Sequence, residues 1–439
     1  MQIVAEVAAT VQAESPNRGP REDRPGRHGV PGQGVLGYDV AAVRAAYPAL
    51  GDGWAYLDGA AGTQVPAAVI AAESAAYAAG IGNHGGAFAA SLRSTALTAA
   101  ARAAVADLVG VGDPDGVVLG PSMTALTYRF AEGLGRTWRP GDEIVVTRLD
   151  HDANVRPWVQ AAERAGVVVR WADPVLPEVE LPAAAVTGLL GERTRLVAVT
   201  AASNVVGTRP DVAAISRAAH DVGALCYVDG VHATPHGPVD VAALGADLYA
   251  TSSYKWSGPH LAAVVGDVRL LETIHPDKLA CSPEEVPWRF ERGTHPMAQH
   301  GGLAAAVDHL AGLASGHLPG TASRRERVLA SMSAVAAHER GLFDRLLEGL
   351  AGLPAVQRIG RPAGGAPTAW FRVSGRTPSE VAEHCAAARV NVWAGHNYAW
   401  ELSGLLGIRD SGSAVRASIS CYTDASDVDC LLQALADLS

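Results

Sequence analysis

One lysine, Lys255, is the residue whose type and surroundings first suggest chemistry. All but two of the 35 basic residues are arginines, and Lys255 lies in the segment "ATSSYKWSGPH" at 250–260. Arginine keeps its proton at any ordinary pH, whereas a partly buried lysine can lose its proton and attack a carbonyl carbon. A lysine at this position of a lysine-poor chain therefore predicts imine chemistry.

Polar side chains follow four apolar runs that are predicted to be strands. In an open parallel sheet, ligands bind beyond the carboxyl ends of the strands. The pattern therefore predicts that a ring, an amide, a carboxylate and an amine meet at one edge of a sheet. His151 follows "EIVVT" (143–147), Asn204 follows "RLVAVT" (195–200), Asp229 and His232 follow "ALCYV" (224–228), and Ser252 and Lys255 follow "DLYAT" (247–251).

The elements that carry these residues indicate an α/β fold. Between about 100 and 265, continuous apolar runs alternate with helical stretches, a pattern typical of strands buried on both faces of a mostly parallel sheet. After about 352 the chain has shorter strands, "AWFRVSG", "VNVWAGH" and "AVRASISCY", with helices at 378–388 and 426–438. We expect a large domain over 38–315 and a smaller α+β domain over 316–439.

The first 37 residues differ in composition from the rest. Residues 14–37 are rich in Pro, Gly and Arg, so they cannot bury enough apolar surface to offset the entropy of ordering, and we expect 1–37 to be a disordered tail. The G-x-G-x-x-G pattern at Gly32, Gly34 and Gly37 follows no strand and therefore does not indicate a dinucleotide site. The folded chain is expected to start near Tyr38 with a short amphipathic helix.

Composition narrows the class of protein. A formal net charge of −10 argues against a nucleic-acid or anionic-membrane partner. The sequence has no apolar run of about 20 residues, the length that a membrane-spanning helix needs, and its start lacks an apolar signal core. Five cysteines without a C-x-x-C pair favour a reducing compartment, so a cytoplasmic protein is expected.

The four groups at the strand ends match the requirements of pyridoxal 5′-phosphate. Its aldehyde needs a lysine amine, and its pyridine nitrogen needs a carboxylate that keeps it protonated, so that the ring acts as an electron sink. The ring needs a flat partner, the phenolic oxygen needs a donor, and the phosphate needs hydroxyls and backbone N–H groups at a helix start. His232 and His236 form H-x-x-x-H without a third ligand, so no metal site is expected.

The segment "VDGVHATPHGPVDVAALGADLYATSSYKWSGPH" at 228–260 resembles the aspartate-to-lysine segment of the class V (fold type I) aminotransferase and cysteine desulfurase family. "YLDGAAGTQVP", "LDHDANVRPW", "FERGTHP" and "AVRASISCYTDASDVD" follow in the family's order, so the resemblance runs from residue 56 to the final helix. It is strongest to the cysteine desulfurase-like branch. It implies a fold type I pyridoxal-phosphate transferase and a homodimer with shared active sites.

The resemblance also implies a role for each matching residue. Lys255 would hold the cofactor aldehyde, Asp229 would pair with the pyridine nitrogen, and His151 would stack on the ring. Asn204 and His232 would lie near the phenolic oxygen, Ser122, Met123, Thr124 and Ser252 would bind the phosphate, Thr294 would reach the neighbouring subunit's phosphate, and Arg416 would bind the substrate α-carboxylate.

The sequence departs from the cysteine desulfurase pattern at the thiol. The stretch 390–407, which corresponds to the mobile cysteine loop, has no cysteine, and Tyr254 stands where desulfurases commonly have histidine before the lysine. Cys281, in a predicted loop, is the one plausible replacement. Cys226 and Cys421 are expected to point away from the site on their strands, and Cys385 and Cys430 are expected to be core residues of helices.

Without that thiol, the same groups favour C–S bond cleavage by β-elimination on cysteine or an S-conjugated cysteine. Lys255 would remove the α-proton, and His396, Asn397 and Tyr398 would line the leaving-group side. Three alternatives stay open: a cysteine desulfurase using Cys281 or an external acceptor, an aminotransferase or epimerase, and a non-catalytic cofactor-binding protein.

Overall fold

The computed structural model describes residues 37–438. The predicted disordered tail lies outside these residues except for Gly37, as do Gly32 and Gly34 of the glycine pattern. The predicted first helix is α2, Val40–Ala45, which Asp39 caps by accepting hydrogen bonds from the N–H groups of Ala41 and Ala42.

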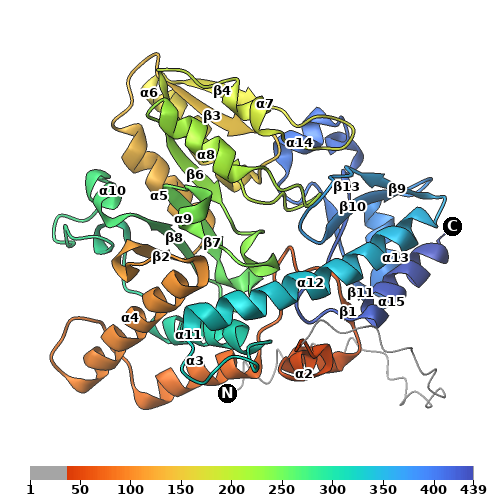
Figure 1. Cartoon of the computed structure of the whole chain (residues 1–439), viewed down its shortest axis with the longest axis horizontal. Helices are drawn as coiled ribbons and strands as arrows, with labels where there is room; N and C mark the ends of the chain where they lie inside the picture. Colours follow the sequence, from red (N-terminus) through yellow and green to blue (C-terminus); the bar gives the residue numbers. More distant parts are fainter. Residues whose placement is uncertain (1–36, 439) are drawn as a thin grey trace, which may run out of the picture. The chain divides into compact units, whose positions relative to one another are not determined.

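A seven-stranded sheet in the order β2-β8-β7-β6-β5-β3-β4 forms the centre of the larger part (Figure 1). Strands β4, β3, β5, β6 and β7 are parallel to one another, while β8 runs antiparallel to both β7 and β2. The predicted mostly parallel sheet is confirmed, with β2 as a strand that the sequence patterns did not indicate. The strands are β2 Val117–Gly120, β3 Glu143–Thr147, β4 Val168–Ala172, β5 Thr194–Thr200, β6 Leu225–Asp229, β7 Leu248–Ser252 and β8 Ala262–Gly266.

Helices cover both faces of this sheet. Alternate residues of a strand point to opposite faces, so Ile144 and Val146 belong to one buried cluster while Val145 belongs to another. Helices α5 and α6 complete the first cluster, and α4, α8, α11 and α12 complete the second. These and the neighbouring helices are α3 Ala67–Ala79, α4 Ala89–Val109, α5 Met123–Gly135, α6 Arg156–Ala165, α7 Ala183–Thr187, α8 Val212–Asp221, α9 Val241–Leu244, α10 Val268–Thr273, α11 Met297–Gly312 and α12 Arg324–Ala351.

The edge strand β4 departs from the predicted burial on both faces. Val168 at its start is 44% exposed, although the apolar run "GVVVRWA" resembles that of a central strand. β4 is the last strand of the sheet and has a single neighbour, β3, so fewer elements cover it. An apolar run does not by itself distinguish an edge strand from a central one.

The C-terminal part is built on a four-stranded antiparallel sheet in the order β12-β13-β10-β9. A separate parallel pair, β1 with β11, brings Ala55 from the N-terminal segment into the same buried cluster as the C-terminal strands. Helices α13 and α15 match the predicted helices and start at capping boxes. The elements are β1 Ala55–Tyr56, β9 Val356–Ile359, β10 Thr368–Val373, α13 Pro378–Ala387, β11 Val390–Asn391, β12 Trp393–Gly395, α14 Trp400–Leu405, β13 Ala414–Ser418 and α15 Ala425–Ala436.

Two predicted C-terminal strands differ from the structure. "VNVWAGH" divides into β11, which pairs with β1, and β12, which pairs with β13. "AVRASISCY" ends as a strand at Ser418, so Cys421 lies in the turn before α15 rather than on a strand face. The domain boundary between 315 and 316 stays a prediction; α12, just after it, contacts both α4 and α15.

A buried ion pair joins α4 and the end of β2 to Glu291, in the segment that also carries Thr294. Arg102 on α4 donates two hydrogen bonds of 2.7 Å to the carboxylate of Glu291, which also accepts the N–H of Leu119 at the end of β2. Burial alone would raise the pKa of Glu291, but the hydrogen bond from His295 and the charge of Arg102 hold it below its ordinary value. The carboxylate is therefore ionised and joins three segments around the edge of the sheet.

We expect Glu291→Gln to lower the free energy of unfolding by about 3 kcal/mol or more, because the buried Arg102 would keep its charge without a full partner. The matched control is Asp429→Asn, which removes the carboxylate of an exposed pair with Arg345, whose side chains are 51% and 50% exposed, and should cost about 1 kcal/mol or less. Urea unfolding measures both. Equal losses in the two variants would contradict the stabilising role of the buried pair.

Candidate active site

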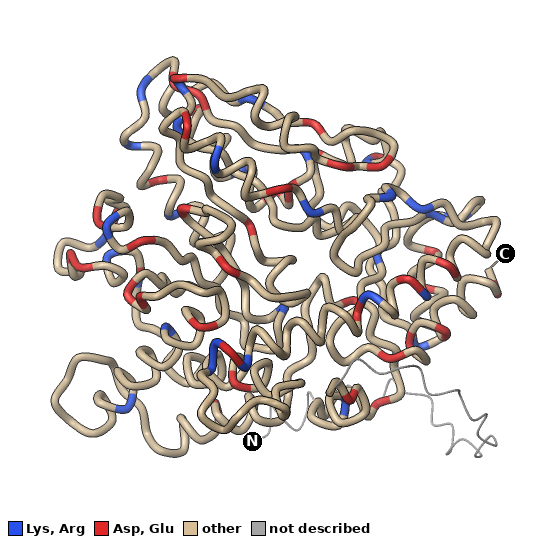
Figure 2. The backbone as a smooth tube through the Cα atoms, in the orientation of Figure 1, with Lys and Arg blue, Asp and Glu red and all other residues tan. Residues whose placement is uncertain are grey.

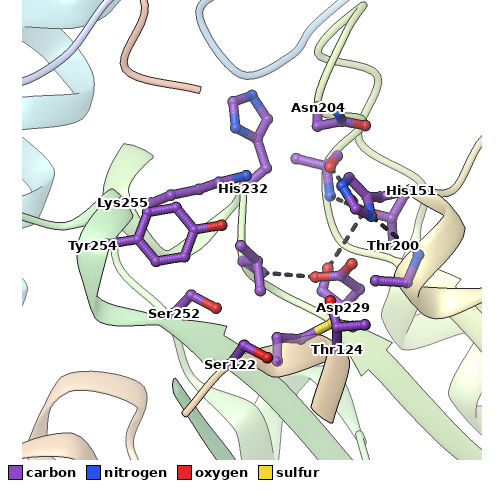
Figure 3. Close-up of a pocket in the computed structure, with 14 residues that line it drawn as sticks. Ser122, Thr124, His151, Thr200, Asn204, Asp229, His232, Ser252, Tyr254 and Lys255 are labelled. Carbon is purple, nitrogen blue, oxygen red and sulfur yellow. Dashed lines mark hydrogen bonds between the residues drawn. The ribbon is translucent and has the colours of Figure 1, made fainter. Parts of the chain in front are cut away.

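The carboxyl ends of four neighbouring strands meet the N-terminus of α5 at one cavity. Asp229 is the last residue of β6, Lys255 ends the 3₁₀ turn Ser253–Lys255 after β7, and His151 follows β3. Because β3, β5, β6 and β7 are parallel, their carboxyl ends reach one edge of the sheet. Nine predicted site residues line this cavity (Figure 3): Ser122, Met123, Thr124, His151, Asn204, Asp229, His232, Ser252 and Lys255.

Asp229 presents a buried carboxyl group to the cavity. It is 5% exposed, and its Oδ1 accepts the N–H of Val231 at 2.9 Å. Burial raises the pKa of Asp229, while the Val231 N–H and the charge of Lys255 act in the opposite direction. A buried carboxylate is stabilised by a cationic N–H group that donates to it. A protonated pyridine nitrogen supplies such a group.

Lys255 is buried and extends into the same cavity as Asp229 (Figure 3). Burial, followed by the positive charge of Arg416, lowers the pKa of Lys255 to about 8, although Asp229 favours the charged form. A substantial fraction of the amine is therefore neutral just above neutral pH, and the neutral form is the one that attacks an aldehyde or accepts a proton.

His151 offers a neutral flat ring to the same cavity. Its Nδ1 accepts the N–H of Ala153 at 3.1 Å, which leaves the ring proton on Nε2. Burial, followed by the charges of Lys255 and Arg416, lowers the pKa of His151 to about 3. The ring of Tyr398 stacks on it with centroids 5.0 Å apart and 21° between the planes.

The start of α5 supplies an anion-binding end to the cavity. Ser122 caps the helix by accepting the N–H of Ala125 at 3.1 Å, and Met123 and Thr124 are the first helical residues. The N–H groups of a first helical turn have no partners inside the helix and lie at the positive end of its dipole. With the hydroxyl of Ser252 in the lining, this end can hold a phosphate group.

Two buried polar atoms of this cavity's lining, Asn204 Oδ1 and His232 Nδ1, lack hydrogen-bond partners, as does Nε of Arg416, which bonds to the carbonyl of Asn204 through Nη1. His232 is neutral, because burial holds its pKa well below the ordinary value, and its Nε2 pairs with Thr368 Oγ1 at 2.9 Å. Since buried polar atoms are nearly always paired in native proteins, these atoms are suited to pair with ligand oxygens and nitrogens. Together with the acid, the amine and the helix start, they fit pyridoxal 5′-phosphate.

A second cavity of about 430 Å³ opens beside Lys255, and Lys255, His151, Asn204 and Tyr254 line both cavities. Arg416, on β13, is 4% exposed and donates from Nη1 to the carbonyl of Asn204 at 3.1 Å. Burial lowers the pKa of Arg416 to about 10, with Asp58 opposing that shift, so the guanidinium is charged at neutral pH. A buried cation next to Lys255 is suited to a carboxylate ligand.

The residues predicted to lie on the leaving-group side line this second cavity. They belong to a loop that contacts the strand ends of the larger sheet. His396, Asn397 and Tyr398 belong to its lining. The carbonyl of Asn397 accepts a hydrogen bond from Asn204 Nδ2 at 2.7 Å, and the carbonyl of Tyr398 accepts the N–H of Asp152 at 2.8 Å. The loop is therefore held against the strand ends that carry the cofactor cavity.

Some lining residues were given no role from the sequence. Tyr254, which precedes Lys255 in the turn after β7, points its hydroxyl into the cofactor cavity (Figure 3). Val231 and Thr200 lie at strand ends and were open to the same argument as Asp229. Trp393 and Ala60 line the second cavity, and only strand pairing and chain folding bring them there.

Two predicted residues lie apart from both cavities. Thr294 lines a separate cavity of about 330 Å³ near the end of β2, so its proposed contact with a neighbouring subunit stays a prediction. Cys281 is exposed in its loop, as expected, and belongs to the lining of neither active-site cavity.

The other cysteines differ partly from expectation. Cys226 and Cys421 are buried, and burial raises the pKa of each thiol to about 12. Cys385 is buried, with its pKa raised to about 11 by burial, as predicted for a core residue. The prediction of a core position was wrong for Cys430, which is exposed because it lies on the outer face of α15.

Three further properties of residues 37–438 are the arrangement of possible metal ligands, the distribution of charge and the apolar character of the helices. Within this range no group of three or more His, Cys, Asp and Glu side chains is placed to hold a metal ion. Basic and acidic positions are interspersed along the chain (Figure 2). Among the described helices, none combines the length and apolar character that crossing a membrane requires.

Comparison with known proteins agrees with this geometry. The family model of aminotransferase class-V matches residues 55–431. An uncharacterized protein of Mycobacterium tuberculosis is 36% identical over 92% of this chain and 100% of its own length. A probable cysteine desulfurase of Pseudomonas aeruginosa is 34% identical over 89% of this chain and 96% of its own.

A solved structure gives the same result for the fold. The cysteine desulfurase CsdA from Escherichia coli superposes with a TM-score of 0.79 at 29% identity, covering 91% of this chain and 98% of that one. The predicted fold type I architecture is thereby confirmed. The chain belongs to the aminotransferase class-V family, in its cysteine desulfurase-like branch, and is a pyridoxal 5′-phosphate-dependent enzyme.

Proposed function

We propose that this enzyme cleaves the C–S bond of cysteine or of an S-conjugated cysteine by β-elimination. The observation that carries the proposal is that Lys255 lines two cavities, one suited to the cofactor and one containing Arg416, and that no cysteine of the described residues lines either cavity. Cysteine-directed activity in named relatives supports sulfur chemistry, whereas the absence of a thiol from both linings favours elimination over transfer to an enzyme cysteine.

Each residue around the substrate has a separate role in the proposed reaction. Arg416 binds the α-carboxylate, which orients the Cα–H bond toward Lys255, the base that accepts this proton on Nζ. Asp229 would keep the pyridine nitrogen of the cofactor protonated. The neutral imidazole of His151 would stack on the pyridine ring. Pyridoxal phosphate supplies the electron sink that stabilises negative charge at Cα.

The overall reaction consumes one water for each substrate. The Cα–H and Cβ–S bonds break, sulfur leaves with the electron pair of the Cβ–S bond and takes up a proton, and the three-carbon remainder hydrolyses. The products are a thiol, pyruvate and ammonium, with no external oxidant or reductant. His396 and Tyr398 lie on the side of the second cavity where the departing sulfur would be protonated.

A cysteine desulfurase is the second candidate, favoured by the names of the related proteins. It would require Cys281, an exposed residue outside both linings, or an acceptor supplied from outside. We retain an aminotransferase or epimerase and a non-catalytic cofactor-binding protein as further alternatives. We also propose a homodimer in which Thr294 reaches the neighbouring subunit.

The decisive measurement is the product formed from L-cysteine and from S-methyl-L-cysteine by the holoenzyme. Elimination predicts one pyruvate and one ammonium per thiol or sulfide released, and the rate should be unchanged in Cys281→Ser. Alanine with a persulfide would establish the desulfurase instead, and a loss of that activity in Cys281→Ser would identify the thiol. Pyridoxamine phosphate with a keto acid would indicate transamination, D-isomer formation would indicate epimerisation, and an absent cofactor absorbance would indicate a non-catalytic protein.

Lys255→Ala should reduce elimination by at least about 10²–10⁴-fold, the usual contribution of a positioned general base, and remove the absorbance of the lysine-bound cofactor. The matched control is Lys278→Ala, because Lys278 is the only other lysine of the sequence and pairs with Glu284 and the carbonyl of Ser282 in a surface loop. Absorbance spectra and pyruvate assays test both variants. Retention of the chromophore in Lys255→Ala would contradict the assignment.

The rate at which the apoprotein attaches pyridoxal phosphate should rise with pH, with a midpoint near pH 8, and level off at higher pH. Only the neutral amine attacks the aldehyde, and the pKa of Lys255 is about 8, so the protonated form dominates below that pH. Arg416→Gln should move the midpoint upward, because the charge of Arg416 contributes to the lowered pKa. Stopped-flow absorbance measures the profile, and a midpoint near 10.5 in the unaltered protein would contradict this environment for Lys255.

A further inference from the structure

The second cavity is larger than a cysteine side chain requires. Its volume of about 430 Å³ lies within the range of about 300–1,000 Å³ that is typical of sites for ligands of many more atoms. Arg416 and Lys255 lie at its inner end and fix the carboxylate and Cα of the substrate under the proposed function. The remaining space therefore lies where a group attached to sulfur would extend.

Trp393 forms a wall of this space directly beside Arg416. The two residues are paired partners on the antiparallel strands β12 and β13, so their side chains project from the same face of the sheet as close neighbours. Trp393 is nevertheless 52% exposed, which is unusual for a large aromatic side chain next to a buried arginine. Its ring presents apolar surface that no described side chain covers fully.

Tyr398 supplies a second aromatic surface, and its backbone is held in place. Asn397 and Tyr398 have φ values of 47° and 60°. This is a left-handed backbone conformation that residues other than glycine rarely adopt. The hydrogen bonds from Asn204 Nδ2 and from the N–H of Asp152 hold this conformation. The ring of Tyr398 stacks on His151 and remains 64% exposed, so it also offers free apolar surface at the cavity.

The charges of the cavity restrict the chemistry of its occupant. Among residues 37–438, the charged side chains in its lining are the cations Lys255 and Arg416, and no carboxylate belongs to it. A substrate substituent with an ammonium group would have no partner there, whereas an uncharged ring would pack against aromatic walls. His396, which stands edge-on to Tyr398 with centroids 6.0 Å apart, extends the same aromatic lining.

We infer, on the basis of the proposed function, that the preferred substrate carries a neutral aromatic group on sulfur, which packs against Trp393 and Tyr398. Aromatic pairs are stabilised beyond the burial of their area, so an aryl group gains more here than a saturated group of equal size. When the ring is bonded directly to sulfur, the group also leaves readily, because the ring delocalises the negative charge on the departing sulfur; an arylmethyl group has only the packing advantage. The enzyme is thus a lyase of S-aryl or S-arylmethyl cysteine conjugates.

The first test compares kcat/KM for pyruvate formation from S-phenyl-, S-cyclohexyl- and S-methyl-L-cysteine and from L-cystathionine, which carries a distal ammonium group. The S-phenyl compound should exceed the S-methyl compound by at least about tenfold and also exceed the S-cyclohexyl compound, with cystathionine the poorest. Equal values for the S-phenyl and S-methyl compounds would overturn the inference while leaving the β-elimination proposal intact.

The second test measures binding without turnover. In the cofactor-loaded Lys255→Ala protein, calorimetry should show S-phenyl-L-cysteine binding at least about tenfold more tightly than S-methyl-L-cysteine. Trp393→Ala or Tyr398→Ala, added to that protein, should abolish the difference. Equal binding of the two compounds overturns the inference, and preferential binding supports it whether or not elimination occurs.

The matched control for Tyr398→Ala is Tyr77→Ala, because Tyr77 is exposed to a similar degree, 67%, but lies on α3 away from the cavity. Tyr77→Ala should leave the S-phenyl preference unchanged. Thermal unfolding of each variant separates a lost contact from a lost fold. If the rings of Trp393 and Tyr398 are instead covered by a second copy of the chain, their substitution weakens self-association in sedimentation and leaves the substrate preference unchanged, which also overturns the inference.

Discussion

The active site depends on placing three ionisable groups, Asp229, Lys255 and Arg416, together where water is largely excluded. Each is at most 6% exposed. Burial disfavours every charge, and the cation Arg416 adds to this effect at Lys255, so the lysine is the group whose pKa falls into the neutral range. Arginine retains its proton in the same surroundings because its ordinary pKa is far higher. One environment thus produces a reactive amine beside a permanent anion receptor.

The position of Lys255 between two cavities follows from the way the two sheets meet. The larger sheet contributes the cofactor cavity at its strand ends, and the smaller sheet contributes Arg416 and Trp393 from β13 and β12. The hydrogen bond between Asn204 and the carbonyl of Asn397 joins the two parts at the point where the cavities connect. The second cavity is therefore lined in part from the smaller sheet and its loop, while the cofactor cavity belongs to the larger sheet.

The fold alone does not specify the reaction, since this architecture is shared with named cysteine desulfurases. The side chains around the active-site cavities bear on the fate of sulfur under the proposed function. The loop from Trp393 to Tyr398 has aromatic and histidine residues and no thiol, and burial raises the pKa of the Cys226 and Cys421 thiols to about 12, which keeps them protonated.

The sequence by itself determined the mostly parallel sheet and the strand-end residues that meet at one cavity, Lys255 among them, because buried parallel strands appear as continuous apolar runs and ligands bind beyond their carboxyl ends. Only the tertiary structure showed that Cys430 is exposed, that β13 ends at Ser418 and that β4 is an edge strand. It also brought Trp393 next to Arg416 and Tyr398 onto His151. These contacts join residues far apart in the chain through strand pairing and loop anchoring, which local patterns of residue type do not encode.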